Sequence, residues 1–141
     1  MKYNYNLINL NNIIEQESCD IKEYFYFNGI RKFDDCDIES LLAFANKITN
    51  KEGFNVSYTI ERLDKEFDLI KYGDNILVNI ELKLSNKDKS QCEKNYELLK
   101  KYYSKEAIYI FCYEKNKEAI FKYNYELKKF EESSFEEQII Y

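Results

Sequence analysis

A short turn between two strand-like runs is the feature that most constrains this chain. Residues 72–75, Tyr-Gly-Asp-Asn, are rich in residues that tolerate positive φ, as short hairpin loops require. In residues 76–83 apolar side chains at even positions alternate with others at odd positions. Because side chains alternate across a strand, Glu81 and Lys83 share one face and Leu82 lies on the other. The sequence therefore predicts a β-hairpin whose second strand ends in a carboxylate and an amine on one face.

The hairpin loop decides what Glu81 faces on the first strand. If residues 74–75 form a two-residue loop, Gly73 faces Ile76 and Asp68 faces Glu81. Directly opposed side chains have Cβ atoms about 4.5–5.5 Å apart. If residues 73–74 form the loop instead, Asp68 faces Asn79 and Glu81 is a diagonal neighbour, still within reach of a shared ion.

Two carboxylates at this separation repel each other unless one is protonated or a cation lies between them. Asp68 and Glu81 would form such a pair. Carboxylate oxygens are hard ligands that suit Mg²⁺ or Mn²⁺. The hairpin therefore predicts a divalent metal site at these two residues.

An acidic residue on one strand, a hairpin and then Glu-x-Lys resembles the PD-(D/E)xK, or restriction-endonuclease-like, nuclease superfamily. Asp68, Glu81 and Lys83 carry this resemblance, and Phe67 stands where the name of the motif has proline. Residues 24–113 also resemble a nuclease-like domain found at the N-terminus of some superfamily-one helicases. The segments that match are FDDCDIESLLAFA, KEFDLIKYGDNILVNIELK and QCEKN.

The resemblance implies a role for each matching residue of the metal site. Asp68 and Glu81 would bind the metal, helped by the backbone carbonyl of Leu82 and by Glu39 on the first helix. Lys83 would orient the attacking water and stabilise developing negative charge. Plainer interpretations also stand: Glu39 would simply favour a helix N-terminus, and Lys83 would form a salt bridge at a strand end.

The second helix is expected to border this site. The resemblance implies that Gln91, Lys94 or Asn95 touches the substrate. A solvated polar face is the more common meaning of such residues on a helix, and it is the interpretation that the sequence favours.

The periodicity of the chain predicts an α/β (α+β) fold. Its coarse order is a helix, three antiparallel strands, a second helix and a strand, which matches a restriction-endonuclease-like αβββαβ core with a mixed central sheet flanked by helices. We expect one domain over residues 1–141, with an N-terminal arm over about 1–33, a core over about 34–123 and a C-terminal tail over about 124–141. The elements are expected at residues 37–48 (helix), 54–63, 66–72 and 76–84 (strands), 89–103 (helix), 107–113 and 119–123 (strands).

Composition narrows the location and the class of protein. The four cysteines are far apart and histidine is absent, so no zinc pattern exists. The absence of a signal-like apolar segment or a long apolar run predicts a cytoplasmic protein. The net charge of −5 counts against a protein that coats DNA without regard to sequence.

Two functions from different classes follow. The first is a metal-dependent nuclease that cleaves DNA phosphodiester bonds, working with a helicase partner or in phage defence, and many nucleases of this fold act as homodimers. The second is a catalytically inactive nuclease-fold protein that acts as a protein-binding module or inhibitor. An unrelated α/β domain with an accidental Glu-x-Lys remains if Asp68 and Glu81 prove distant.

Overall fold

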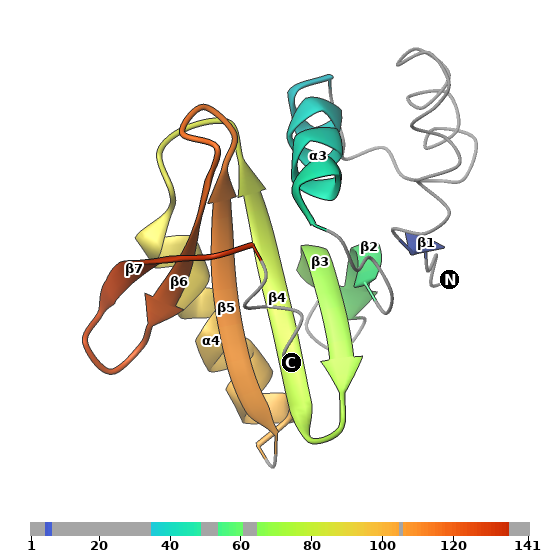
Figure 1. Cartoon of the computed structure of the whole chain (residues 1–141). Coiled ribbons are helices and arrows are strands. Elements are labelled where there is room, and N and C mark those ends of the chain that lie inside the picture. The colour runs from blue at the N-terminus through green and yellow to red at the C-terminus, as the bar shows by residue number, and fades with distance from the viewer. Residues whose placement is uncertain (1–4, 7–34, 49–53, 61–64, 105, 136–141) are drawn as a thin grey trace.

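The computed structural model describes residues 5–6, 35–48, 54–60, 65–104 and 106–135, which form an α+β fold. Within this part, two helices flank a mixed sheet of seven strands, and the strands lie side by side in chain order (Figure 1). The elements are β1 (Tyr5–Asn6), α3 (Asp35–Lys47), β2 (Phe54–Ile60), β3 (Lys65–Gly73), β4 (Ile76–Lys83), α4 (Lys89–Tyr102), β5 (Ala107–Glu114), β6 (Ala119–Asn124) and β7 (Lys129–Ser133).

The predicted order of helix, three strands, helix and strand is present from α3 to β5. The pairs β2–β3 and β3–β4 are antiparallel, whereas β4 and β5 are parallel and are joined through α4. A parallel pair needs such a crossover because the chain must return to the end of the sheet at which the first of the two strands began. Strands β6 and β7 then extend the sheet by antiparallel pairing.

Some predicted boundaries differ from the observed ones. Helix α3 begins at Asp35, two residues before the predicted start, and β7 lies inside the segment predicted to be a C-terminal tail. Strand β7 is short and mostly charged, so its sequence did not predict a strand. Most of the predicted N-terminal arm lies outside the described residues, and β1 is its described part.

The two helices cover opposite faces of the sheet and so create two cores. On one face, Leu41 and Phe44 of α3 pack with Val78, Ile80 and Leu82 of β4. On the other face, residues of α4 pack with β4, β5 and β6; this cluster contains Leu77, Cys92, Leu99, Ile108, Ile110, Cys112 and Tyr123. The even and odd residues of β4 therefore face different helices, as alternation along a strand requires. Glu81 lies at an odd position, so its side chain is on the α4 face.

The hairpin between β3 and β4 fixes the register of the site. Gly73 pairs with Ile76, so Asp74 and Asn75 form a two-residue loop, which is the first of the two registers predicted. Asn75 has φ of 60°, the left-handed conformation that asparagine tolerates better than most residues. The last backbone pair before the site is Leu69 with Ile80.

Candidate active site

Asp68 and Glu81 meet at the point where the regular backbone pairing of β3 and β4 stops. The Asp68 backbone N–H donates to Glu81 Oε2 at 3.0 Å, and the Leu82 backbone N–H donates to Asp68 Oδ2 at 2.9 Å. Each carboxylate thus binds a backbone amide on the neighbouring strand, in place of a backbone carbonyl. The structure therefore brings together the two acids that the sequence singled out.

The Glu81 carboxylate is buried and surrounded by hydrogen-bond donors. Glu81 is 0% exposed and Asp68 is 9% exposed. Besides the Asp68 amide, Glu81 Oε2 accepts from Asn79 Nδ2 at 3.2 Å, and Glu81 Oε1 accepts from Gln91 Nε2 at 2.8 Å. These three N–H donors hold the buried Glu81 carboxylate in one orientation.

A buried amide network extends from Glu81 into the core beneath α4. Asn79 Nδ2 also donates to the Leu69 carbonyl at 3.0 Å, and Asn79 Oδ1 accepts from Asn95 Nδ2 at 3.0 Å. Asn79 and Asn95 are both 0% exposed. The preference for a solvated polar face was therefore wrong for Asn95, which packs against the sheet.

Sequence reasoning missed Asn79 as part of the site. It lies two residues before Glu81 and so on the same face of β4, in a strand that is otherwise mostly apolar. A lone amide beside a carboxylate in such a strand is the signal that could have identified it, because buried polar groups need partners.

Gln91 reaches the acid pair because α4 begins beside it. The Asp88 side chain caps this helix, accepting from the Gln91 backbone N–H at 3.0 Å. The capped first turn fixes the start of the helix, and the half-buried Gln91 side chain then donates to Glu81. Gln91 of α4 therefore contacts Glu81, one of the two predicted metal ligands, directly.

Lys83 ends β4 two residues beyond Glu81 and on the same face. It is half-buried, and it lies opposite Glu114 in the parallel register of β4 and β5. Within the described residues the ion pairs of Glu114 are made with Lys87 and Lys117. Lys83 thus follows the acid pair on its own strand without an ion pair to a described residue, a position that suits the role implied by the resemblance.

The other predicted site residues lie elsewhere or act differently. Glu39 is exposed on α3, over the opposite face of the sheet, and its Oε1 binds Lys115 Nζ at 2.6 Å. Lys94 is exposed on the outer side of α4, where it lines a shallow hollow. Leu82 meets Asp68 through its backbone N–H, while its side chain packs in the core that α3 covers. The structure brings neither Glu39 nor Lys94 to the acid pair.

The donor set fits a hard divalent ion that is only partly ligated by protein. Magnesium commonly uses one or two carboxylates and completes its coordination with water and substrate phosphate. Asp68 and Glu81 supply two opposed carboxylates that are largely or wholly buried. Within the described residues no group of three or more His, Cys, Asp or Glu side chains could hold a metal, so the candidate donor set there consists of these two carboxylates alone.

A pair of cysteines lies next to Glu81 on the α4 face. Cys112 is the partner of Glu81 in the β4–β5 register, and both Cys92 and Cys112 are buried free thiols. The hydrogen bond with Cys112, together with burial, raises the pKa of the Cys92 thiol. Because the thiolate is the reactive form, Cys92 is held as an inert core residue rather than a nucleophile.

Comparisons of the chain with protein-family models, curated proteins and solved structures found no match. In the described part of the chain, neither helix combines the length and apolar character that crossing a bilayer requires.

Proposed function

We propose that this protein is a metal-dependent nuclease of the restriction-endonuclease-like class that hydrolyses DNA phosphodiester bonds. The observation that carries the proposal is a pair of hydrogen bonds across the β3–β4 hairpin: the Glu81 carboxylate accepts from the Asp68 backbone N–H, and the Asp68 carboxylate accepts from the Leu82 backbone N–H. Two acids are held together at the end of a strand pair, and an amine follows on the same face. The helix–strand order from α3 to β5 supports the same assignment.

Each residue of the site has a task in this reaction. Asp68 and Glu81 would hold Mg²⁺ or Mn²⁺, which supplies polarisation of a phosphate oxygen and a lower pKa for a bound water. Asn79 and Gln91 hold the Glu81 carboxylate in one orientation. The Lys83 ammonium stabilises the negative charge that develops on the phosphate and orients the attacking water. No covalent intermediate with the protein is needed.

DNA affinity is expected to come partly from a second protein. The chain has a net charge of −5, and DNA binding draws most of its strength from lysine and arginine contacts to phosphate. A helicase partner, or another component of a phage-defence system, would hold the DNA near the site. A second copy of the chain would serve the same purpose in a homodimer.

A catalytically inactive protein-binding module is the second candidate. Its supporting observation is that Glu81 is 0% exposed and already accepts at least three hydrogen bonds. A metal would have to compete with the Gln91 and Asn79 amides for those oxygens. In this case the acid pair is a structural remnant, and the surface of the domain carries the function.

A cleavage assay separates the two candidates. Labelled single-stranded and duplex DNA would be incubated with the protein and Mg²⁺ or Mn²⁺, alone and with EDTA. We expect metal-dependent cleavage that falls by about 10²–10³-fold in Lys83→Ala, the usual loss when one charge-stabilising donor is removed. Lys101→Ala is the matched control, because Lys101 is exposed in the last turn of α4, and it should cleave normally.

Cleavage that survives in both Lys83→Ala and Asp68→Asn would contradict the assigned site. Absence of cleavage by the wild type under all conditions, together with binding to a protein partner that is unchanged in Asp68→Ala and Glu81→Ala, would favour the inactive module.

A further inference from the structure

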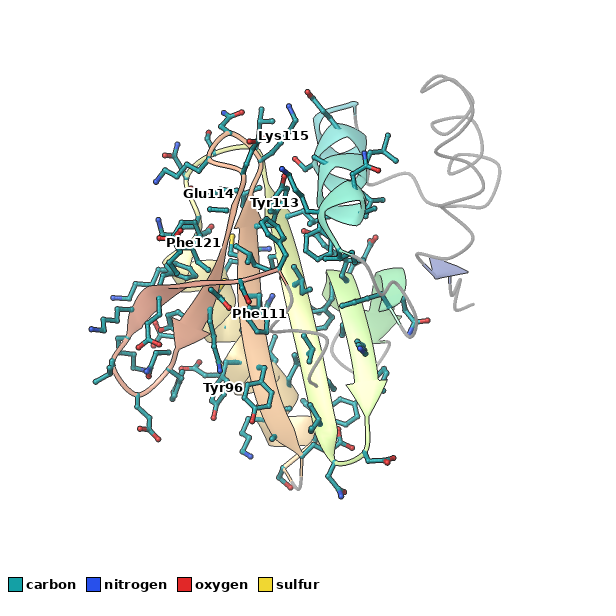
Figure 2. The ribbon with its side chains drawn as sticks, viewed as in Figure 1. Tyr96, Phe111, Tyr113, Glu114, Lys115 and Phe121 are labelled. Atoms are coloured by element: carbon teal, nitrogen blue, oxygen red, sulfur yellow. The ribbon has the colours of Figure 1, made fainter. Side chains whose placement is uncertain are left out.

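The end of the sheet beside the acid pair carries a cluster of lysines around one buried glutamate. Strands β4 and β5 run parallel and both finish there, at Lys83 and Glu114. The segments that follow them stay paired: the Lys115 N–H donates to the Lys83 carbonyl and the Asn116 N–H to the Leu84 carbonyl, each at 2.9 Å. Figure 2 shows Glu114 and Lys115 at this end of β5.

Glu114 is the centre of the cluster. It is 1% exposed, and its Oε1 accepts from the Lys87 backbone N–H. The Lys87 Nζ lies 3.8 Å from Oε1, and the Lys117 Nζ lies 3.4 Å from Oε2. Oε2 is buried and has no hydrogen-bond partner among the described residues. The Glu114 carboxylate thus forms ion pairs with two ammonium groups that come from different segments of the chain.

An aromatic ring holds the same two ammonium groups from another side. The Lys87 Nζ lies 4.2 Å and the Lys117 Nζ 5.9 Å from the ring centroid of Phe121 on β6. Cations within about 6 Å of a ring centroid are attracted to its face. The Lys87 side chain is 26% and the Lys117 side chain 62% exposed, so both ammonium groups remain in contact with solvent.

The charge of the two segments around Glu114, residues 83–89 and 114–118, differs in sign from that of the whole chain. Residues 83–89 and 114–118 contain five lysines, at 83, 87, 89, 115 and 117, against the acids Asp88, Glu114 and Glu118. Lys47 and Glu39 of α3, which pair with Glu118 and Lys115, add one charge of each sign. A positive end on an acidic protein attracts an anion locally.

From this geometry we propose that Lys87 and Lys117, held by Glu114 and Phe121, form a subsite for a DNA backbone phosphate next to the cleaved bond. The proposal rests on the proposed nuclease function and names residues that neither the sequence pattern nor the resemblance indicated. Lys83 lies next to both the acid pair and the Glu114 cluster, because it is opposite Glu114 and two residues from Glu81. A DNA strand bound at the acid pair would thus have its neighbouring phosphates beside these ammonium groups.

The salt dependence of DNA binding tests the subsite without relying on cleavage. Binding of a fluorescent DNA oligonucleotide would be measured by anisotropy in EDTA over a range of salt concentrations. Each lysine that contacts a phosphate contributes about one unit to the slope of log K against log salt concentration. We expect Lys87→Gln/Lys117→Gln to lose about 1–2 units of slope, and Lys87→Arg/Lys117→Arg to retain it because the charge is kept.

Lys100→Gln/Lys101→Gln in the last turn of α4, where both side chains are exposed, is the matched control and should keep the wild-type slope. If the double glutamine variant fails to fold, as judged by circular dichroism, the single variant Lys117→Gln replaces it, because Lys117 is the more exposed of the two. An unchanged slope in the subsite variants, an equal loss in the control, or no DNA binding by the wild type would each overturn the proposal.

The outcome is distinguishable from failure of the proposed nuclease function. If DNA binding depends on Lys87 and Lys117 but the protein never cleaves DNA, the phosphate subsite is supported and the proposed nuclease function is contradicted. If cleavage depends on Lys83 but the subsite variants leave the salt dependence of DNA binding unchanged, the nuclease function is supported and the phosphate subsite is contradicted.

Discussion

Replacing Asn79 by leucine should destabilise the protein because three hydrogen bonds meet at this buried amide. Asn79 donates to the Leu69 carbonyl and to Glu81 Oε2, and it accepts from Asn95 Nδ2. In Asn79→Leu the Asn95 side chain is left with neither of its polar atoms paired to a described residue, because Asn95 Oδ1 already has no hydrogen-bond partner there. The substitution therefore leaves the buried Asn95 amide without a hydrogen-bond partner among the described residues.

The magnitude follows from these losses. The bond to the Glu81 carboxylate contributes about 1.5–3 kcal/mol, the bond to the Leu69 carbonyl about 0.5–1.5 kcal/mol, and the Asn95 amide left without a partner costs about 1–3 kcal/mol. Burying a leucine side chain at the site returns about 1.5–3 kcal/mol. We therefore expect Asn79→Leu to lower the free energy of unfolding by roughly 3 kcal/mol.

The double variant Asn79→Leu/Asn95→Leu gives the reasoning its sharpest test. Removing both partners of a buried hydrogen bond leaves no stranded amide, and the leucine introduced at position 95 would lie beside the apolar residues Cys92 and Leu99. The double variant should recover about 1–3 kcal/mol relative to Asn79→Leu.

Urea unfolding followed by circular dichroism measures these free energies, provided that the slope of unfolding free energy against urea is the same in each variant. A cost below about 0.5 kcal/mol for Asn79→Leu, or a double variant that is less stable than Asn79→Leu, would refute the account of the network.

Two further predictions concern Tyr113, which is 0% exposed and whose hydroxyl has no hydrogen-bond partner among the described residues. Tyr113→Phe should raise the free energy of unfolding by about 1 kcal/mol in the same urea assay, because it removes an unsatisfied buried group; a loss of stability would show that the hydroxyl is paired. Burial raises the pKa of Tyr113, with a smaller contribution from Glu118, so the folded state favours the neutral form. This contribution is complete below the unfolded pKa of about 10 and is lost as pH rises towards the folded pKa. The stability of the wild type should therefore fall above about pH 10, and Tyr113→Phe should flatten that fall. Identical alkaline profiles would contradict this.

The hairpin register was predictable because it depends on local residues. A two-residue loop with Asp74 and Asn75 leaves one pairing of the flanking strands, which runs to Leu69 and Ile80 and brings Asp68 and Glu81 to the next position along the two strands. The strand and helix order followed from periodicity in the same way. Such local signals fix which face of a strand a residue occupies, and hence which acids can meet.

The supporting residues were not predictable because they depend on how α4 packs. Asn95 reads as a polar helix residue, and only the position of α4 over β4 buries it against Asn79. The Glu114 cluster brings Lys87 from the loop before α4 to Glu114 of β5 and Phe121 of β6, so no spacing in the sequence reveals it. Glu39 shows the same limit: it was expected in the first turn of a helix, but α3 begins at Asp35 and covers the other face of the sheet, where Glu39 pairs with Lys115.

Binding of Mn²⁺ or Mg²⁺ to the purified protein tests the central claim most directly, because the acid pair is assigned as a metal site whether or not DNA is cleaved. Isothermal titration calorimetry would be combined with thermal unfolding in the presence of the metal. An ion that binds only the folded state stabilises it by about 2.7 kcal/mol at 100 times its Kd. We predict saturable binding and a raised Tm for the wild type and for Glu39→Gln, and loss of both in Asp68→Asn. Absence of binding by the wild type, or equal binding by Asp68→Asn, would contradict the account.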